Sequence, residues 1–140
     1  MKVSFIATSA LSAPARRKIE KKINALLRAL PSVVMKKMPQ EASVIFTTPA
    51  ESKKLNVIYR GKQKPANVLS FPYDKTYGEI FVTPAVVRKE ALKSGEKAEE
   101  RLVKMIIHGM LHLSGLDHEI SANDAEAFER LEEKLIRLAL

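Results

Sequence analysis

The chain has 140 residues, which is the size of one domain, and we expect residues 1–140 to form a single domain. Its 46% hydrophobic residues are enough for a core, and the absence of cysteine excludes disulfides and thiolate zinc sites. No stretch matches a signal peptide or the roughly 18 apolar residues of a membrane helix, so we expect a cytoplasmic protein without membrane contact.

The net charge of +8 is distributed unevenly along the chain. Residues 1–75 carry 15 Lys and Arg against 4 Asp and Glu, whereas residues 76–140 carry 9 against 12. A concentrated basic field favours a polyanionic partner, and nucleic acid above all. A solvated basic helix face gives the same count, so charge alone leaves both interpretations open.

Hydrophobic periodicity predicts alternating strands and helices in the first half of the chain. Ile19, Ile23 and Leu30 recur at helical spacing, and Ser12 is a suitable N-cap for that helix. The predicted elements are a strand at 2–7, a helix at 12–30, a proline-bounded connection at 31–39, a strand at 42–48, and a helix at 49–61 that Gly61 ends.

The second half predicts a hairpin followed by three helices. Thr83 and Gly95 suit the two ends of the first of these helices, while Ser121 and Asp124 form a capping-box pattern for the last. The predicted elements are a loop at 62–66, antiparallel strands at 67–72 and 78–84 around a turn at 73–77, and helices at 85–95, 96–115 and 121–140. This order indicates an α/β (α+β) layered fold, with a small mixed sheet of about four strands packed with helices.

All three histidines lie in one eleven-residue segment, HGMLHLSGLDH. His108 and His112 are four residues apart, so a helix places both on one face, within reach of one ion at about 2.0–2.1 Å. Gly115 can end the helix and let the chain return His118 to the same ion. Three nitrogens leave a fourth position open, as in catalytic zinc sites. The alternative is that the histidines are packing or surface residues, which their clustering disfavours. The ligands do not fix the metal, since imidazole also suits copper, nickel and iron.

Gly109 separates this segment from the peptidase motif that it otherwise matches. The spacing of the histidines is metzincin-like, but metzincin peptidases place their general-base glutamate where this chain has glycine. Without a carboxylate there, the peptidase mechanism loses its proton acceptor. The sequence therefore predicts a metzincin-like three-histidine metal site with a different chemistry.

A second segment at 55–72, LNVIYRGKQKPANVLSFP, contains candidate substrate ligands. An arginine at the end of the predicted helix can hold a phosphate bidentately, and nearby lysines add attraction for it. The candidates are Arg60, Lys62, Lys64, Asn67 and Ser70. The alternative is a surface cation, two solvated lysines, a turn residue and a strand-edge hydroxyl.

Two aromatic residues, Tyr59 and Phe71, lie in the same segment. Large aromatic side chains commonly fill cores. We expect both to be core residues rather than platforms on which a nucleobase stacks.

Together, the two segments resemble the YbeY family of bacterial metal-dependent endoribonucleases, and GEIFVT at 78–83 follows them in the family's order. The resemblance implies a single-domain α/β fold with zinc held by His108, His112 and His118. It also implies cleavage of single-stranded RNA, maturation of the 3′ end of small-subunit ribosomal RNA, and ribosome quality control. Ribosomal proteins or assembly factors are implied as partners.

The combined interpretation is metal-assisted hydrolysis of RNA phosphodiesters. Arg60 is expected to hold the scissile phosphate and stabilise its developing charge. Asp117 is either a residue that orients a ligand histidine or a turn residue. Because no residue stands out as general base, attack by the RNA's own 2′-hydroxyl is as open as attack by water.

Three other functions remain at this point. A metal-dependent peptidase is disfavoured by Gly109 and by the basic charge. A hydrolase of small phosphoesters would need a substrate screen to distinguish it. A non-enzymatic ribosome assembly factor with a structural metal is disfavoured because structural zinc is usually bound by four protein ligands.

Overall fold

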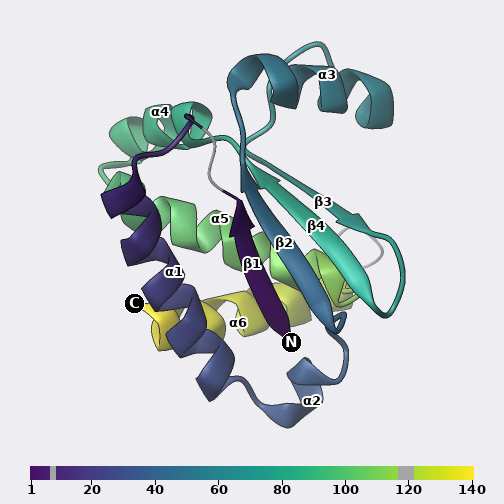
Figure 1. Cartoon of the computed structure of the whole chain (residues 1–140). Coiled ribbons are helices and arrows are strands. Elements are labelled where there is room, and N and C mark those ends of the chain that lie inside the picture. Colours follow the sequence, from purple (N-terminus) through teal and green to yellow (C-terminus); the bar gives the residue numbers. More distant parts are fainter. Residues whose placement is uncertain (7–8, 117–121) are drawn as a thin grey trace.

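The computed structural model describes residues 1–6, 9–116 and 122–140, which form four strands and six helices (Figure 1). The strands are β1 (Lys2–Ile6), β2 (Glu41–Phe46), β3 (Val68–Pro72) and β4 (Tyr77–Val82). The helices are α1 (Ala13–Ala29), α2 (Ser32–Met35), α3 (Pro49–Arg60), α4 (Pro84–Ser94), α5 (Ala98–Leu113) and α6 (Ala122–Ala139).

The four strands form one mixed sheet in the order β1-β2-β4-β3. β1 pairs with β2 and β2 with β4 in parallel, whereas β3 and β4 form the predicted antiparallel pair. The mixed α/β architecture with a four-stranded sheet is therefore confirmed. β3 lies at an edge of the sheet, so one side of this strand is available to line a cleft.

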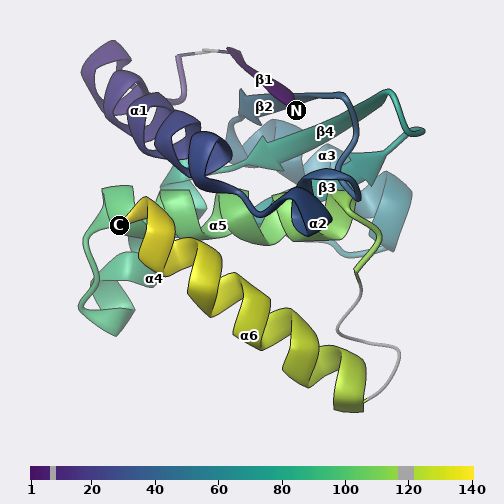
Figure 2. The ribbon, with the colours of Figure 1, turned by 90° about the horizontal axis from the view of Figure 1, so that it is seen from below.

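The core lies between the sheet and α5, and α6 packs on the opposite side of α5 (Figure 2). Val44, Phe46, Ile80 and Val82 point from the two central strands into this core and are fully buried. Apolar side chains occupy most of α5, and they are buried because the helix is covered on both sides. The helix that carries two of the histidines is thus the most enclosed in the fold.

The ends of several helices follow the sequence signals, while two features of the structure differ from the prediction. The hydroxyl of Ser12 accepts a hydrogen bond from the Ala15 amide, as expected of an N-cap. The connection at 31–39 contains the short helix α2, which four residues are too few to reveal by periodicity. Thr83 occupies the N-cap position of α4, but its buried hydroxyl makes no capping bond. The Ser121 cap lies outside the described residues.

Helix α3 is fastened to the loop that follows it by two side chains on its inner face. The Ser52 hydroxyl donates to the carbonyl of Ala66 at 3.0 Å and accepts from its amide at 2.9 Å. The Asn56 amide nitrogen donates to the carbonyl of Lys64 at 2.8 Å. Gly61, in the left-handed conformation at φ 66°, ends the helix directly after its last residue. The end of α3 is therefore held in place relative to the start of β3.

Among the described residues, no helix is both long enough and apolar enough to cross a lipid bilayer.

Candidate active site

A cleft of about 640 Å³ runs along the edge strand β3, between the last turn of α3 and the C-terminal half of α5. Its volume lies in the range of about 300–1,000 Å³ that is common for ligand sites. The cleft brings together the two sequence segments singled out above. Its lining consists of Tyr59, Arg60, Asn67, Val68, Leu69, Ser70, Phe71, Pro72, His108 and His112.

The two helical histidines face one another across one turn of α5. Their ring centroids are 4.8 Å apart, and the Nε2 atoms of His108 and His112 are separated by 3.1 Å. Two nitrogens that each bind one tetrahedral ion at about 2.0–2.1 Å stand about 3.3 Å apart. The pair therefore fits two neighbouring ligands of such an ion.

Helix α6 contributes a carboxylate to this pair that the sequence did not reveal. Glu132 Oε2 lies 2.6 Å from His108 Nδ1. A carboxylate accepts hydrogen bonds, so Nδ1 carries the proton, and the neutral ring then has its lone pair on Nε2. Metal-binding histidines in proteins are commonly oriented by such a bond. The only sequence signal for this contact is that Glu132 follows Phe128 by four residues, so that both lie on one side of an amphipathic helix.

Phe128 holds the histidine rings from the same helix. Its ring centroid lies 5.2 Å from those of both His108 and His112, and its side chain is buried. The contact restricts rotation of both imidazoles. The orientation of the histidine pair is therefore set by α6 as well as by α5.

Gly109 lies where α5 comes closest to the sheet. A Cβ atom at this position would stand 2.7 Å from Ile80 Cγ2 and 3.0 Å from Ser70 Oγ. The hydroxyl of Ser70 also donates to the carbonyl of Gly109 at 3.3 Å. A glutamate side chain has no room between helix and strand, so the glycine here is a packing requirement.

Arg60 is the last residue of α3, and its exposed side chain lines the cleft together with the histidines. Lys62 and Lys64 are exposed in the loop that follows, outside the lining of the cleft. The guanidinium is thus placed to contact a phosphate in the cleft, while the two lysines are exposed to solvent in the neighbouring loop. Ser70 lines the cleft as the sequence suggested, with its hydroxyl on Gly109.

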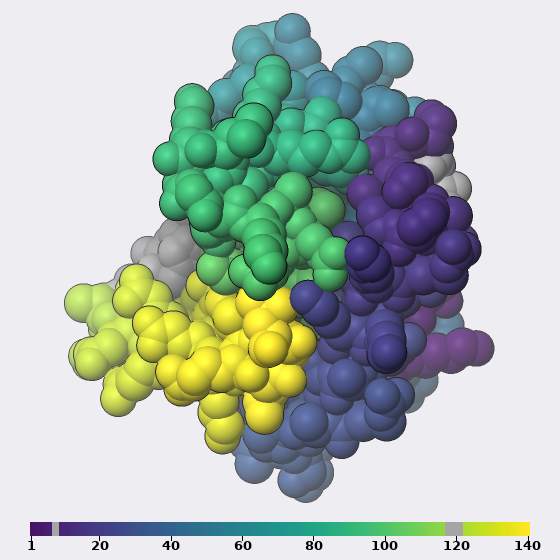
Figure 3. All heavy atoms as spheres, turned by 90° about the vertical axis from the view of Figure 1, so that its left-hand side faces the viewer, coloured from purple at the N-terminus to yellow at the C-terminus, as the bar shows by residue number. Residues whose placement is uncertain are grey.

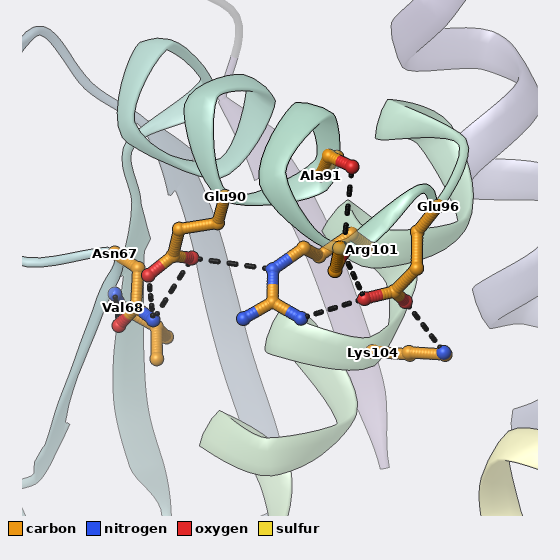
Figure 4. Close-up of polar contacts among 8 residues, drawn as sticks. Asn67, Val68, Glu90, Ala91, Glu96, Arg101 and Lys104 are labelled. Atoms are coloured by element: carbon orange, nitrogen blue, oxygen red, sulfur yellow. Dashed lines mark hydrogen bonds and ion pairs between the residues drawn. The ribbon is translucent and has the colours of Figure 1, made fainter.

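Asn67 lines the cleft, but its amide is engaged by protein groups (Figure 4). Its Nδ2 donates to both carboxylate oxygens of Glu90 at 3.2 Å, and its Oδ1 accepts from the Val68 amide at 2.7 Å. Glu90 also accepts from Arg101 Nε at 3.3 Å. The side chain predicted to bind substrate thus anchors the start of β3 to α4 and α5.

The same network continues to Glu96 in the connection between α4 and α5 (Figure 4). Glu96 accepts from Lys104 Nζ at 2.6 Å, from the Ser94 hydroxyl at 2.8 Å and from Arg101 Nη1 at 2.9 Å. These hydrogen bonds, with that from Lys104 the strongest, lower the pKa of Glu96 to about 2. The carboxylate stays charged at neutral pH, and the network keeps its ion pairs.

The expectation that Tyr59 belongs to the core is wrong. Its side chain is 64% exposed, on the last turn of α3 beside the cleft. Phe71 is half-buried and lines the same cleft. A single tyrosine at a helix end has no periodic signal that separates a buried from an exposed position, so the sequence could not decide this point.

Much of the positive charge of the first half lies in two separate groups. The lysines of α1 surround a hollow of about 480 Å³ between α1, the start of α5 and the end of α6, on the face in Figure 3. One of them, Lys22, pairs with Glu99 at 3.2 Å. The second group lies on α3 and the following loop, where Arg60 lines the cleft, and comprises Lys53, Lys54, Arg60, Lys62 and Lys64.

Two predicted site residues, Asp117 and His118, lie outside the described residues. Over residues 1–6, 9–116 and 122–140, no three metal-ligating side chains form a group that could hold an ion. Of the three predicted histidine ligands, the described residues include His108 and His112, and the three-histidine site stays a prediction. Gly115, at φ 84°, ends that helix as its position predicted.

The sequence model of a family described as Endoribonuclease YbeY matches residues 6–139. The chain belongs to the YbeY family. This confirms the resemblance seen in the two motif segments, which both contribute residues to the lining of the cleft.

Relatives in this family include two proteins named Endoribonuclease YbeY. That of Chelativorans sp. (strain BNC1) is 39% identical over 104 residues, or 68% of this chain and 63% of the relative. That of Chromohalobacter salexigens is 44% identical over 103 residues, or 69% and 66%. The matched region thus spans just under two thirds of the length of these curated relatives.

A solved structure with the same fold is the solution structure of TM1509 from Thermotoga maritima. The likeness has a TM-score of 0.68 at 26% identity, and it covers 98% of this chain and 88% of that one. The arrangement of sheet and helices described above is therefore one that a related chain adopts.

We predict that Gly109→Ala lowers the free energy of unfolding by about 1–3 kcal/mol, because the new methyl group overpacks the contact with Ile80. Helix propensity alone predicts the opposite sign, a gain of about 1 kcal/mol. Urea unfolding of the purified protein measures the difference.

The double variant Gly109→Ala, Ile80→Ala serves as the control, because it removes the atom that the new methyl group meets. The free energy of unfolding that the double variant loses should be smaller than the sum of the losses in the two single variants. A Gly109→Ala protein as stable as the parent would contradict the packing explanation.

Proposed function

We propose that this protein is a zinc-dependent endoribonuclease that cleaves single-stranded RNA and matures the 3′ end of small-subunit ribosomal RNA in the cytoplasm. The observation that carries the proposal is one cleft in which the Nε2 atoms of His108 and His112, 3.1 Å apart, share the lining with Arg60. Membership of a family described as Endoribonuclease YbeY supports the RNA substrate. Ribosomal proteins or assembly factors are the partners that this role would require.

His108, His112 and His118 would hold the ion, and the first two present a donor pair that fits it. When bound, zinc supplies a Lewis acid that polarises a phosphate oxygen and lowers the pKa of bound water. Glu132 keeps the proton of His108 on Nδ1, which leaves Nε2 as the donor. Phe128 limits rotation of both rings.

Arg60 has the role of holding the scissile phosphate. Its guanidinium presents a planar set of donors that matches two phosphate oxygens, and it stays charged as negative charge develops on them. The lysines of α3 and the following loop add a field that attracts the RNA backbone. Asp117, next to His118, would orient that ligand from behind.

Cleavage breaks the bond from phosphorus to one bridging oxygen, and that oxygen leaves with a proton. With water as nucleophile, a new phosphorus–oxygen bond forms and the phosphate ends as a monoester. With the 2′-hydroxyl, the product is a cyclic phosphate and a free 5′-hydroxyl. Among the described residues that line the cleft there is no carboxylate, so the ends of the products will identify the nucleophile.

The geometry at Gly109 argues against a peptidase. The position of the peptidase's glutamate base is filled by Ile80 and Ser70, so no carboxylate can be placed there without moving the helix. RNA cleavage without a side-chain base at this position is the function that the cleft supports best.

We expect His112→Ala to lose both zinc binding and RNA cleavage, because it removes one of the paired Nε2 donors. Zinc content by atomic emission and cleavage of a defined single-stranded RNA, each with and without chelator, are the two measurements. Undiminished cleavage by this variant, or by the parent in chelator, would contradict the metal-dependent mechanism.

Glu132→Gln should weaken zinc binding by about 10- to 100-fold, because a neutral amide orients and polarises His108 less well. Glu133→Gln is the matched control, since the neighbouring carboxylate is exposed on the same helix. Competition titration with a zinc-sensitive dye measures affinity without reference to activity. Equal affinities in the two variants would remove Glu132 from the site.

Arg60→Gln should reduce kcat/KM for RNA by roughly 100-fold or more and leave zinc affinity unchanged, because it removes a phosphate contact and no metal ligand. Arg88→Gln, which removes an exposed arginine from α4, controls for the change in net charge. Steady-state cleavage kinetics compare the two. Similar rates for both variants would rule out a phosphate-binding role for Arg60.

A further inference from the structure

Tyr59 presents a large, exposed aromatic ring at the wall of the catalytic cleft. Its side chain is 64% exposed and directly precedes Arg60 on the last turn of α3. Both residues line the cleft that contains His108 and His112. Much of the ring is therefore open to a ligand that enters this cleft.

The ring is held in position by a chain of aromatic contacts. Tyr59 lies against Phe71 with centroids 4.9 Å apart and planes inclined by 61°, and Phe71 lies against Phe81 at 5.6 Å and 81°. Both contacts are edge-to-face, so Phe71 is not stacked parallel on Tyr59. A ligand that stacks on a ring fixed in this way loses little conformational entropy of the protein.

Tyr73 is an equally exposed tyrosine whose ring and hydroxyl both contact other residues of the protein. Its exposure is similar, at 62%, but its ring is stacked on Tyr77 at 5.9 Å with an interplanar angle of 11°. Its hydroxyl donates to Glu79 at 2.6 Å, which raises the pKa of Tyr73 to about 12. Tyr73 does not line the cleft, which makes it a matched comparison for Tyr59.

We propose that Tyr59 is the platform on which a base of the RNA stacks, next to the phosphate held by Arg60. The proposal rests on the proposed function and names a specificity residue for it. Arg60 and Tyr59 are consecutive residues, so they are spaced to contact the phosphate and the base of one short stretch of backbone. Stacking on an aromatic ring is available to every base, which makes such a contact tolerant of sequence.

The same contact discriminates between single and double strands. A base in a duplex is covered on both faces by its neighbours and cannot reach a side chain without leaving the helix. A base in a single strand can turn out and stack on Tyr59. The tyrosine thus selects unpaired RNA, while the charges of α3 attract RNA of either kind.

The test compares Tyr59→Leu, Tyr59→Phe and Tyr73→Leu in the zinc-loaded protein. The substrates are one single-stranded RNA and versions of it with a single abasic residue at successive positions around the cleavage site. Cleavage gives kcat/KM for each pair. Binding is followed separately with 2-aminopurine at the same positions, whose fluorescence is quenched by stacking.

We expect the parent protein to lose about five- to 100-fold in kcat/KM when the abasic residue occupies one particular position. Tyr59→Leu should show that loss on intact RNA and no further loss on the abasic RNA, whereas Tyr59→Phe and Tyr73→Leu should behave as the parent. Equal rates for Tyr59→Leu and the parent on intact RNA would overturn the proposal. So would an equal penalty from the abasic residue in both.

The binding arm separates this proposal from the proposed function. If the parent cleaves no RNA, the endoribonuclease proposal fails, but 2-aminopurine quenching still decides the role of Tyr59. Quenching that Tyr59→Leu abolishes and Tyr73→Leu retains supports the platform. Quenching that is the same in both variants, or absent from the parent, overturns it.

Discussion

The close approach of α5 to the sheet at Gly109 is the constraint on which the candidate site depends. Only a residue without a side chain fits between the helix backbone, Ile80 and Ser70. This contact brings the flanking turn of α5, with His108 and His112, against the edge strand β3. A helix held further out by one methyl group would separate the histidines from the strand that forms the other wall of the cleft.

The two walls of the cleft are fixed by different parts of the chain. On α6, Glu132 fixes the proton of His108 on Nδ1, and Phe128 packs against the rings of both histidines. Asn67, held by Glu90, fixes the start of β3 relative to α4 and α5. A site that depends on positions within fractions of an ångström needs such support, because the residues that contact the ligand are not held precisely enough by themselves. The residues around the site therefore determine its geometry together with the residues that line it.

Sequence patterns gave most of the fold because the relevant signals are local. The antiparallel hairpin, the Ser12 cap and the helix-ending glycines Gly61 and Gly115 all depend on neighbouring residues, and the structure has each of them. The facing of His108 and His112 follows from helix geometry in the same way.

What the sequence missed depends on contacts between distant segments. The hydrogen bond from His108 to Glu132 joins residues 24 apart, and the hydrogen bond from Asn67 to Glu90 joins residues 23 apart. The sequence motif explains Gly109 only as the absence of a glutamate. In the structure, a glycine is required because Ile80, in a strand some thirty residues earlier in the chain, leaves no room for a side chain. Residue type alone places Tyr59 in the core. The prediction is wrong because residue type says little about which side of a helix end faces solvent.

The separation of the basic residues into two groups assigns them different physical roles. Lys22 pairs with Glu99, nine residues before His108 on α5, which corresponds to about 14 Å along the helix axis. This distance exceeds the Debye length of about 8 Å at physiological ionic strength, so the charges of α1 are largely screened at the cleft. If the protein cleaves RNA as proposed, these charges would speed the encounter with RNA at low salt, but they would not stabilise charge that develops at the scissile phosphate. In the proposed function, that stabilisation would come from Arg60, at the end of the helix that Ser52 fastens to Ala66.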